Sequence, residues 1–228
     1  MIKNVLLDLD DTILDFGKCE SVAVSDTFRQ IGIEPSEELV VRYSQINDMH
    51  WKMLEKKELT RQQVLVGRFD MLFKELGISF SGSRADEIYK KNLGEQSFFV
   101  EGALSLLENL SALYNLYIVS NGTATVQDSR IERAGIAGYF KDIFIPERIG
   151  VNKPDIHFFE KCFEKIPGFL PEETVIIGDS LSSDMKGGNN AGIKTIWYNP
   201  KGIENNMDIK IWKQVRFLSD IPDILKLL

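Results

Sequence analysis

Short apolar runs recur along the chain, and most of them end in polar residues. Each run is as long as a strand and is rich in branched or aromatic side chains, a pattern typical of buried strands in a parallel sheet. The pattern predicts six strands, at residues 3–9, 116–119, 142–145, 174–177, 194–198 and 215–218.

Helical periodicity fills several of the segments between these strands. It predicts helices at residues 102–112, 124–134, 155–165 and 182–191. Because strands that alternate with helices form βαβ units, we expect an α/β fold. Its core should be a doubly wound, Rossmann-like parallel sheet with helices on both faces.

Residues 16–98 follow a different pattern, with amphipathic helical periodicity and no convincing strand. Thr60 is followed three residues later by Gln63, which is the capping-box pattern of a helix start. The expected helices span residues 21–31, 36–57, 60–76 and 84–93. We therefore predict an α-helical cap at residues 16–98, inserted into an α/β catalytic core formed by residues 1–15 and 99–228.

Composition narrows the class of protein. Hydrophobic residues make up 43% and charged residues 27% of the 228 residues, which is ordinary for a globular protein. The formal net charge of −7 disfavours a nucleic-acid polymer as a partner, because a negative field repels its phosphates. The two cysteines and two histidines show no zinc-type spacing.

The sequence also argues against a membrane protein. Its longest apolar runs are short and broken by charges, and Asp8, Asp10 and Asp11 interrupt the N-terminal segment where a signal peptide needs an apolar core. We therefore expect a cytoplasmic protein with reduced thiols and no membrane partner.

Polar side chains follow the expected strands at four points. Because ligands bind beyond the carboxyl ends of strands in open parallel sheets, we expect these points to form one site. They are Asp8-Leu9-Asp10-Asp11-Thr12, Ser120-Asn121-Gly122, Lys153-Pro154, and Gly178-Asp179-Ser180 with Asp184 beyond.

These residue types suit phosphate chemistry. Clustered carboxylates repel one another and favour a hard cation such as Mg²⁺, while Lys153, Ser120 and the backbone N–H groups of Asn121 and Gly122 can bind phosphate oxygens. Attack by the Asp8 carboxylate on phosphorus would bring two anions together, at a cost of about 4 kcal/mol at ~4 Å and an effective dielectric of ~20. The cation and Lys153 would offset this repulsion.

Each motif has a structural alternative when taken alone. An isolated Asp-x-Asp pair is usually solvated or caps a helix, Ser120-Asn121-Gly122 is typical of a turn, and Asp184 could favour a helix N-terminus. Their order along the chain at successive strand ends favours the catalytic interpretation. Asp11 remains better explained as a turn or capping residue.

The four motifs, in this order, resemble those of the haloacid-dehalogenase superfamily, and the resemblance covers essentially the whole chain. It implies that Asp8 forms an aspartyl-phosphate and that Asp10 acts as the acid and base. It further implies a Mg²⁺ site formed by the carboxylates of Asp8 and Asp179 and the backbone carbonyl of Asp10, with Asp184 supporting it. An acid at Asp10 resembles the phosphatases and phosphomutases of the superfamily, whereas its dehalogenases lack one. In the same resemblance, Ser120 and Lys153 bind the transferring phosphoryl group.

The predicted cap resembles that of the pyrimidine 5′-nucleotidases within this superfamily. Within the cap, the resemblance lies in residues 43–51 and 59–69. Residues 14–16 and 150–154 carry the same resemblance. It implies a nucleoside monophosphate as the small phosphorylated substrate. Candidate contacts to the nucleotide are Phe16, Trp51 and Arg68, together with Asn121 and Gly122.

Other interpretations stay open at this point. Phe16 and Trp51 could belong to the cap core, and Arg68 could be a surface charge. The substrate could be another small phosphate, such as phosphoglycolate or a sugar phosphate, acted on by a phosphatase or a phosphomutase. A non-catalytic binding protein could also retain the scaffold, although binding alone would not require Asp10.

Overall fold

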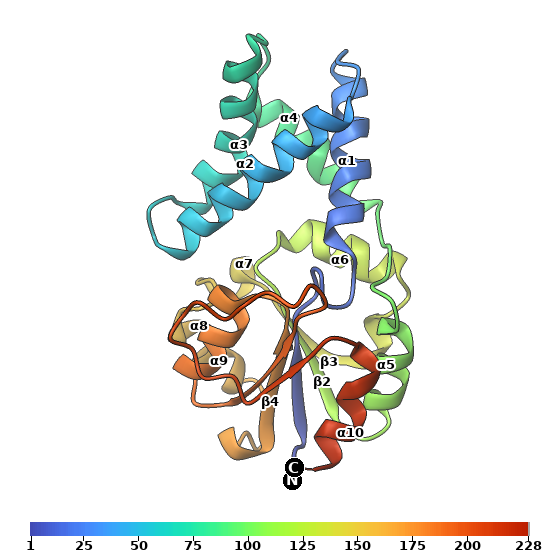
Figure 1. Ribbon diagram of the computed structural model, residues 1–228, viewed down its shortest axis with the longest axis vertical. Coiled ribbons are helices and arrows are strands. Elements are labelled where there is room, and N and C mark those ends of the chain that lie inside the picture. Colours follow the sequence, from blue (N-terminus) through green and yellow to red (C-terminus); the bar gives the residue numbers. More distant parts are fainter. Residues whose placement is uncertain (228) are drawn as a thin grey trace. The chain divides into compact units, whose positions relative to one another are not determined.

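The computed structural model describes residues 1–227 and divides them into two compact units. The first, the α/β unit, comprises residues 1–15, 98–124 and the described residues from 134 onward. The second, the helical unit, comprises residues 16–97 and 125–133. The chain therefore passes between the units after Asp15, Ser97, Ala124 and Arg133. Figure 1 traces this path.

The α/β unit is built on a parallel sheet whose described strands have the order β3-β2-β1-β4-β5-β6. The strands are β1 (Asn4–Leu7), β2 (Asn115–Val119), β3 (Phe140–Phe144), β4 (Thr174–Gly178), β5 (Lys194–Tyr198) and β6 (Lys213–Val215). From β1 the chain builds outward to β3, then returns to the other side of β1 for β4. The order thus reverses between β1 and β4, where ligands bind in folds of this type. The predicted fold class is confirmed.

Helices cover both faces of this sheet. Figure 1 shows α5 (Ala103–Ser111) and α10 (Ile221–Lys226) on one side, and α8 (Ile156–Phe163) and α9 (Lys186–Asn190) on the other. Because β1 and β4 are buried along their whole length, residues 5–7 and 175–177 are apolar on both faces rather than alternating. A further short helix, α7 (Pro146–Ile149), follows β3.

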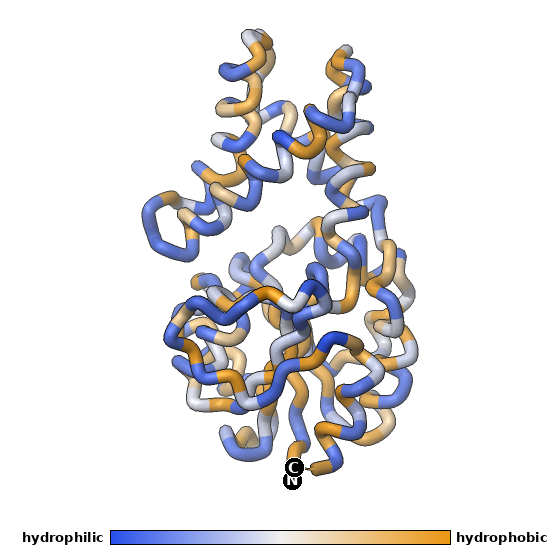
Figure 2. The backbone as a smooth tube through the Cα atoms, in the orientation of Figure 1, coloured by the Kyte–Doolittle hydropathy of each residue, from blue (hydrophilic) through white to orange (hydrophobic). Residues whose placement is uncertain are grey.

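The helical unit contains four consecutive helices and most of a fifth. They are α1 (Phe16–Gln30), α2 (Glu37–Glu55), α3 (Arg61–Leu76), α4 (Gly82–Gly94) and α6 (Ala124–Arg133). Tyr43, Phe69 and Tyr89 pack ring against ring at its centre. Figure 2 shows hydrophobic and hydrophilic positions alternating along α2 and α3, as expected for helices with one buried face.

Local signals in the sequence place several of these boundaries. The predicted capping box is present, since Thr60 Oγ1 accepts from the Gln63 N–H and Gln63 Oε1 accepts from the Thr60 N–H. The hydroxyl groups of Ser36 and Ser81 cap α2 and α4 by accepting from the backbone N–H groups of Leu39 and Arg84. None of the helices in the described residues is both long and apolar enough to cross a bilayer.

Some expected boundaries were wrong. The strand expected at 215–218 ends at Val215, because Phe217 points to solvent and Leu218 begins a helical turn. The helix expected at 182–191 begins with a π-helical turn, Leu181–Met185, before α9. Helix α1 begins at Phe16, earlier than the apolar periodicity indicates.

A chain of polar contacts crosses the helical unit. The Arg68 guanidinium, 3% exposed, donates to Asp86 Oδ1 at 2.7 Å and to Asn47 Oδ1 at 2.8 Å. Asn47 and Ser44 in turn donate to the buried Glu20 carboxylate. The alternative that Arg68 is a surface charge was therefore wrong. Buried charges need such partners, because an unpaired ion in a low-dielectric interior is costly.

We predict that Asp86→Ala lowers the free energy of unfolding by about 3–5 kcal/mol, because it removes the carboxylate paired with the buried Arg68. Urea denaturation followed by circular dichroism measures this change. Asp26→Ala is the matched control, since the Asp26–Arg29 pair is exposed and should contribute less than about 1 kcal/mol. Equal losses in the free energy of unfolding for the two variants would contradict the stabilising role of the buried pair.

Candidate active site

The predicted site residues of the α/β unit lie at the carboxyl ends of its strands. Asp8 continues β1, with its N–H donating to Ile177 O at 2.9 Å. Ser120 continues β2 in the same way, its N–H donating to Phe144 O at 3.1 Å. Asp179 directly follows β4. The sheet ladder therefore fixes these positions at the point where the strand order reverses.

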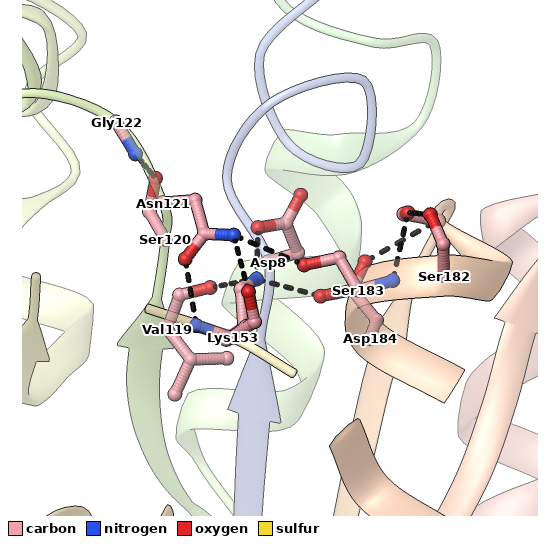
Figure 3. A network of polar contacts seen from close by, with 10 residues as sticks. Asp8, Val119, Ser120, Asn121, Gly122, Lys153, Ser182, Ser183 and Asp184 are labelled. Carbon is pink, nitrogen blue, oxygen red and sulfur yellow. Dashed lines mark hydrogen bonds and ion pairs between the residues drawn. The ribbon is translucent and has the colours of Figure 1, made fainter. Parts of the chain in front are cut away.

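Lys153 joins the strand ends. Its Nζ lies 2.7 Å from Asp8 Oδ1, 2.6 Å from Asp184 Oδ1 and 2.6 Å from Val119 O (Figure 3). Only 2% of the residue is exposed. Since an ammonium group has three hydrogens to donate, each of these acceptors can take one. Lys153 thus links residues that lie far apart in the sequence.

The electrostatics of the site follow from burial and crowding. Burial raises the pKa of the Asp8 carboxyl well above its usual value, and the nearby Asp184 charge adds to this, while Lys153 opposes it. The pKa of Asp179 is raised well above its usual value, first by burial and then by Asp8 and Asp184. Burial alone would lower the pKa of Lys153, but Asp184 and Asp8 raise it overall.

These carboxylates fit a hard divalent cation. Asp8, Asp179 and Asp184 each offer one carboxylate oxygen, and the three oxygens lie within 4.8 Å of one another. Oxygen donors of this kind suit Mg²⁺, and the repulsion between them is what a cation would relieve. The Asp10 side chain is not part of this group, but its charge also raises the pKa of Asp8, so it lies near.

The segment that carries Asp184 is held close to β4. Asp184 Oδ2 accepts from the Ser180 N–H at 3.2 Å, within the π-helical turn. A Cβ added at Gly178 would lie 2.3 Å from Asp184 Oδ2 and 2.7 Å from its Cβ, so the end of β4 must be glycine. The Trp197 indole N–H donates to Asp179 O at 2.7 Å. Sequence patterns did not indicate this contact.

The turn after Asp10 carries unusual backbone geometry. Asp11 has a φ of 56°, in the left-handed region that few residues other than glycine, asparagine and aspartate adopt. Its N–H donates to Leu14 O at 2.7 Å, and the N–H groups of Ile13 and Leu14 donate to Leu9 O. This geometry fits the turn role expected for Asp11.

The loop after β2 differs from expectation in detail. Ser120 is buried, and the N–H of Gly122, predicted to face phosphate, donates to Ser120 Oγ at 3.0 Å. The Asn121 side chain contacts the backbone of Lys153 and the hydroxyl of Ser183, whereas the phosphate contact predicted for Asn121 is through its backbone N–H. Ser183 is a site neighbour that the motifs did not indicate.

The three remaining candidates lie in the helical unit. The Arg130 guanidinium lies 5.9 Å from the centroid of the Phe16 ring, and that of Arg61 lies 5.4 Å from the Trp51 ring. Arg68 is held by its buried partners, as described above. Contacts of Phe16, Trp51 and Arg68 with a substrate stay predictions.

Comparisons with known proteins show the family of the chain. Residues 5–198 match the family model of the haloacid dehalogenase-like hydrolases. The chain is 38% identical to pyrimidine 5′-nucleotidase PynA of Streptococcus pneumoniae, over 98% of this chain and 94% of that one. It is 27% identical to pyrimidine 5′-nucleotidase YjjG of Escherichia coli, over 87% and 89%. The magnesium-bound crystal structure of the putative hydrolase YfnB from Bacillus subtilis superposes with a TM-score of 0.95, at 38% identity and 98% coverage of both chains.

We predict that Mg²⁺ raises the melting temperature more at about pH 8 than at about pH 5.5. Because the pKa values of Asp8 and Asp179 are raised in the folded state, the folded protein holds protons that the unfolded chain releases above its carboxyl pKa of ~4. The metal-free protein therefore loses stability from these groups as the pH rises, and Mg²⁺ should compensate. Thermal scans with Mg²⁺ and with NaCl of equal ionic strength measure the difference, and a larger Mg²⁺ shift at the lower pH would contradict it.

Proposed function

The chain belongs to the haloacid dehalogenase-like hydrolases, and from that premise we propose that it is a Mg²⁺-dependent phosphatase of nucleoside 5′-monophosphates with a preference for pyrimidines. The observation that supports phosphoryl chemistry is the buried Lys153 between Asp8 and Asp184, beside Asp179. The pyrimidine preference rests on the likeness to PynA over nearly the full chain.

Asp8 is the proposed nucleophile. Lys153 holds one of its carboxylate oxygens, which favours the ionised form and fixes its direction. The other oxygen attacks phosphorus, a bond from Asp8 to phosphorus forms, and the bond from phosphorus to the nucleoside 5′-oxygen breaks. Mg²⁺ bound by Asp8, Asp179 and Asp184 would supply the positive charge that lets two anions meet.

Asp10 is the proposed acid and base. It lies two residues after Asp8 in a chain that turns back sharply at Asp11. In the first step it gives a proton to the departing 5′-oxygen. In the second it takes a proton from the water that attacks phosphorus, and the bond to Asp8 breaks to release phosphate and restore the carboxylate.

Ser120 and Lys153 are the proposed ligands of the phosphoryl oxygens. The three hydrogens of Lys153 already have protein acceptors, so a phosphoryl oxygen must share or replace one of them. Charge-assisted contacts of this kind strengthen as negative charge spreads over the transferring group. Lys153 would therefore act on both the nucleophile and the phosphoryl group.

We predict that, with Mg²⁺, kcat/KM for UMP and dUMP exceeds that for hexose phosphates and phosphoglycolate by at least about tenfold, which corresponds to roughly 1.4 kcal/mol. Phosphate release over a panel of nucleotides and sugar phosphates measures this ranking. EDTA should abolish the phosphate release. A reversed ranking would overturn the nucleotide proposal and leave a phosphatase of another small phosphate. Interconversion of sugar phosphates without phosphate release would indicate a phosphomutase.

We predict that Asp8→Asn lowers kcat by at least about 10³-fold, because an amide oxygen is a poor nucleophile. Its circular dichroism spectrum should match the wild type. The matched control is Asp11→Asn in the same loop, since asparagine tolerates the left-handed backbone found there and should keep most of the activity. Turnover by Asp8→Asn comparable to that of the wild type would exclude covalent catalysis at Asp8.

A further inference from the structure

The Asn121 side chain pairs with the backbone of Lys153 on both of its polar groups. Asn121 Nδ2 donates to Lys153 O at 3.0 Å, and Asn121 Oδ1 accepts from the Lys153 N–H at 2.9 Å (Figure 3). One amide thus holds the N–H and the C=O of a single residue. Such a two-point contact fixes the orientation of that residue as well as its distance.

The same amide reaches a third segment. Asn121 Nδ2 also donates to Ser183 Oγ at 3.3 Å, and the Ser183 N–H donates to Ser180 Oγ at 3.2 Å. Ser183 precedes Asp184, whose carboxylate contacts Lys153 Nζ. The contacts therefore form a closed ring from Asn121 through Lys153, Asp184 and Ser183 back to Asn121. The ring joins the loop after β2, the loop of Lys153 and the π-helical turn.

Lys153 needs such support, because it lies between α7 and α8 and outside both helices. A lysine side chain has four flexible bonds and loses about 2 kcal/mol of rotamer entropy when it is fixed. Its Nζ nevertheless meets three acceptors at 2.6 to 2.7 Å. A displaced backbone would move the ammonium group away from all three.

We infer that Asn121 is a positioning residue, which orients the Lys153 backbone so that the ammonium group meets Asp8 and Asp184. This assignment concerns the Asn121 side chain, and the phosphate contact expected of the Asn121 backbone N–H stays a prediction. It deepens the proposed function and rests on it for the effect on turnover. The hydrogen-bond geometry itself does not depend on the substrate.

The test is Asn121→Ala, measured by steady-state kinetics and by hydrogen exchange. We expect kcat for UMP to fall by about 10- to 100-fold with KM within about threefold, because a misplaced Lys153 affects the reacting geometry more than substrate capture. The Lys153 N–H loses its acceptor, so its exchange should become faster. Mass spectrometry of a peptide covering 151–155 reports this well, because Pro154 has no N–H.

Ser182→Ala is the matched control. It removes a neighbouring hydroxyl that contacts Ser180 Oγ and lies outside the ring. Its kcat and the exchange of the Lys153 N–H should match the wild type. If Asn121→Ala does not fold, Ser183→Ala is the second variant, since it opens the ring at its 3.3 Å contact and should lower kcat by a smaller factor with KM unchanged.

Two results would overturn the assignment. One is a raised KM with unchanged kcat in Asn121→Ala, which would mark a substrate contact. The other is unchanged exchange of the Lys153 N–H in that variant. Failure of the proposed function has a different signature: the wild-type protein would release no phosphate from UMP with Mg²⁺, while the exchange measurement would still test the contact between Asn121 and Lys153.

Discussion

The ammonium group of Lys153 carries the positive charge at a point where three carboxylates converge. Each pair of carboxylates at ~4 Å repels by about 4 kcal/mol at an effective dielectric of ~20, so the cluster cannot stay fully ionised without cations. Lys153 offsets part of this charge through direct contacts with Asp8 and Asp184. Burial first, and then the remaining negative charge, raise the pKa of Asp8 and Asp179. A metal ion is therefore a natural further partner of the cluster.

The sheet makes this convergence possible. Asp8 and Lys153 lie 145 positions apart, and Lys153 and Asp184 lie 31 apart, so no local structure could bring them together. The carboxyl ends of parallel strands all lie at the same edge of the sheet. The strand order reverses between β1 and β4, and ligands bind at such a point of this edge. The hydrophobic burial of β1 and β4 thus supplies the stability that holds like charges close.

The sequence predicts what depends on residue type and local order. Apolar runs ending in acids gave the strands and their polar ends, and the Thr60–Gln63 pair gave a helix start, because each signal lies within a few neighbouring residues. The partner that a polar side chain finds depends on the tertiary fold rather than on neighbouring residues. The Asn121 amide suits a phosphate oxygen as well as a peptide group, and only the folded chain shows that Lys153 is its partner. Likewise, Arg68 finds Asp86 on another helix, beyond the reach of any helical spacing.

Because of helix α6, the helical unit is discontinuous along the chain and is more than a single insertion. Residues 125–133 follow β2, yet they belong to that unit, where Ser129 Oγ donates to Gly94 O and Arg130 Nε donates to Gln96 O. Replacing residues 16–97 alone would remove the partners of these two contacts from α6. A chimera or fragment meant to carry the whole helical unit therefore has to include residues 125–133 as well as 16–97.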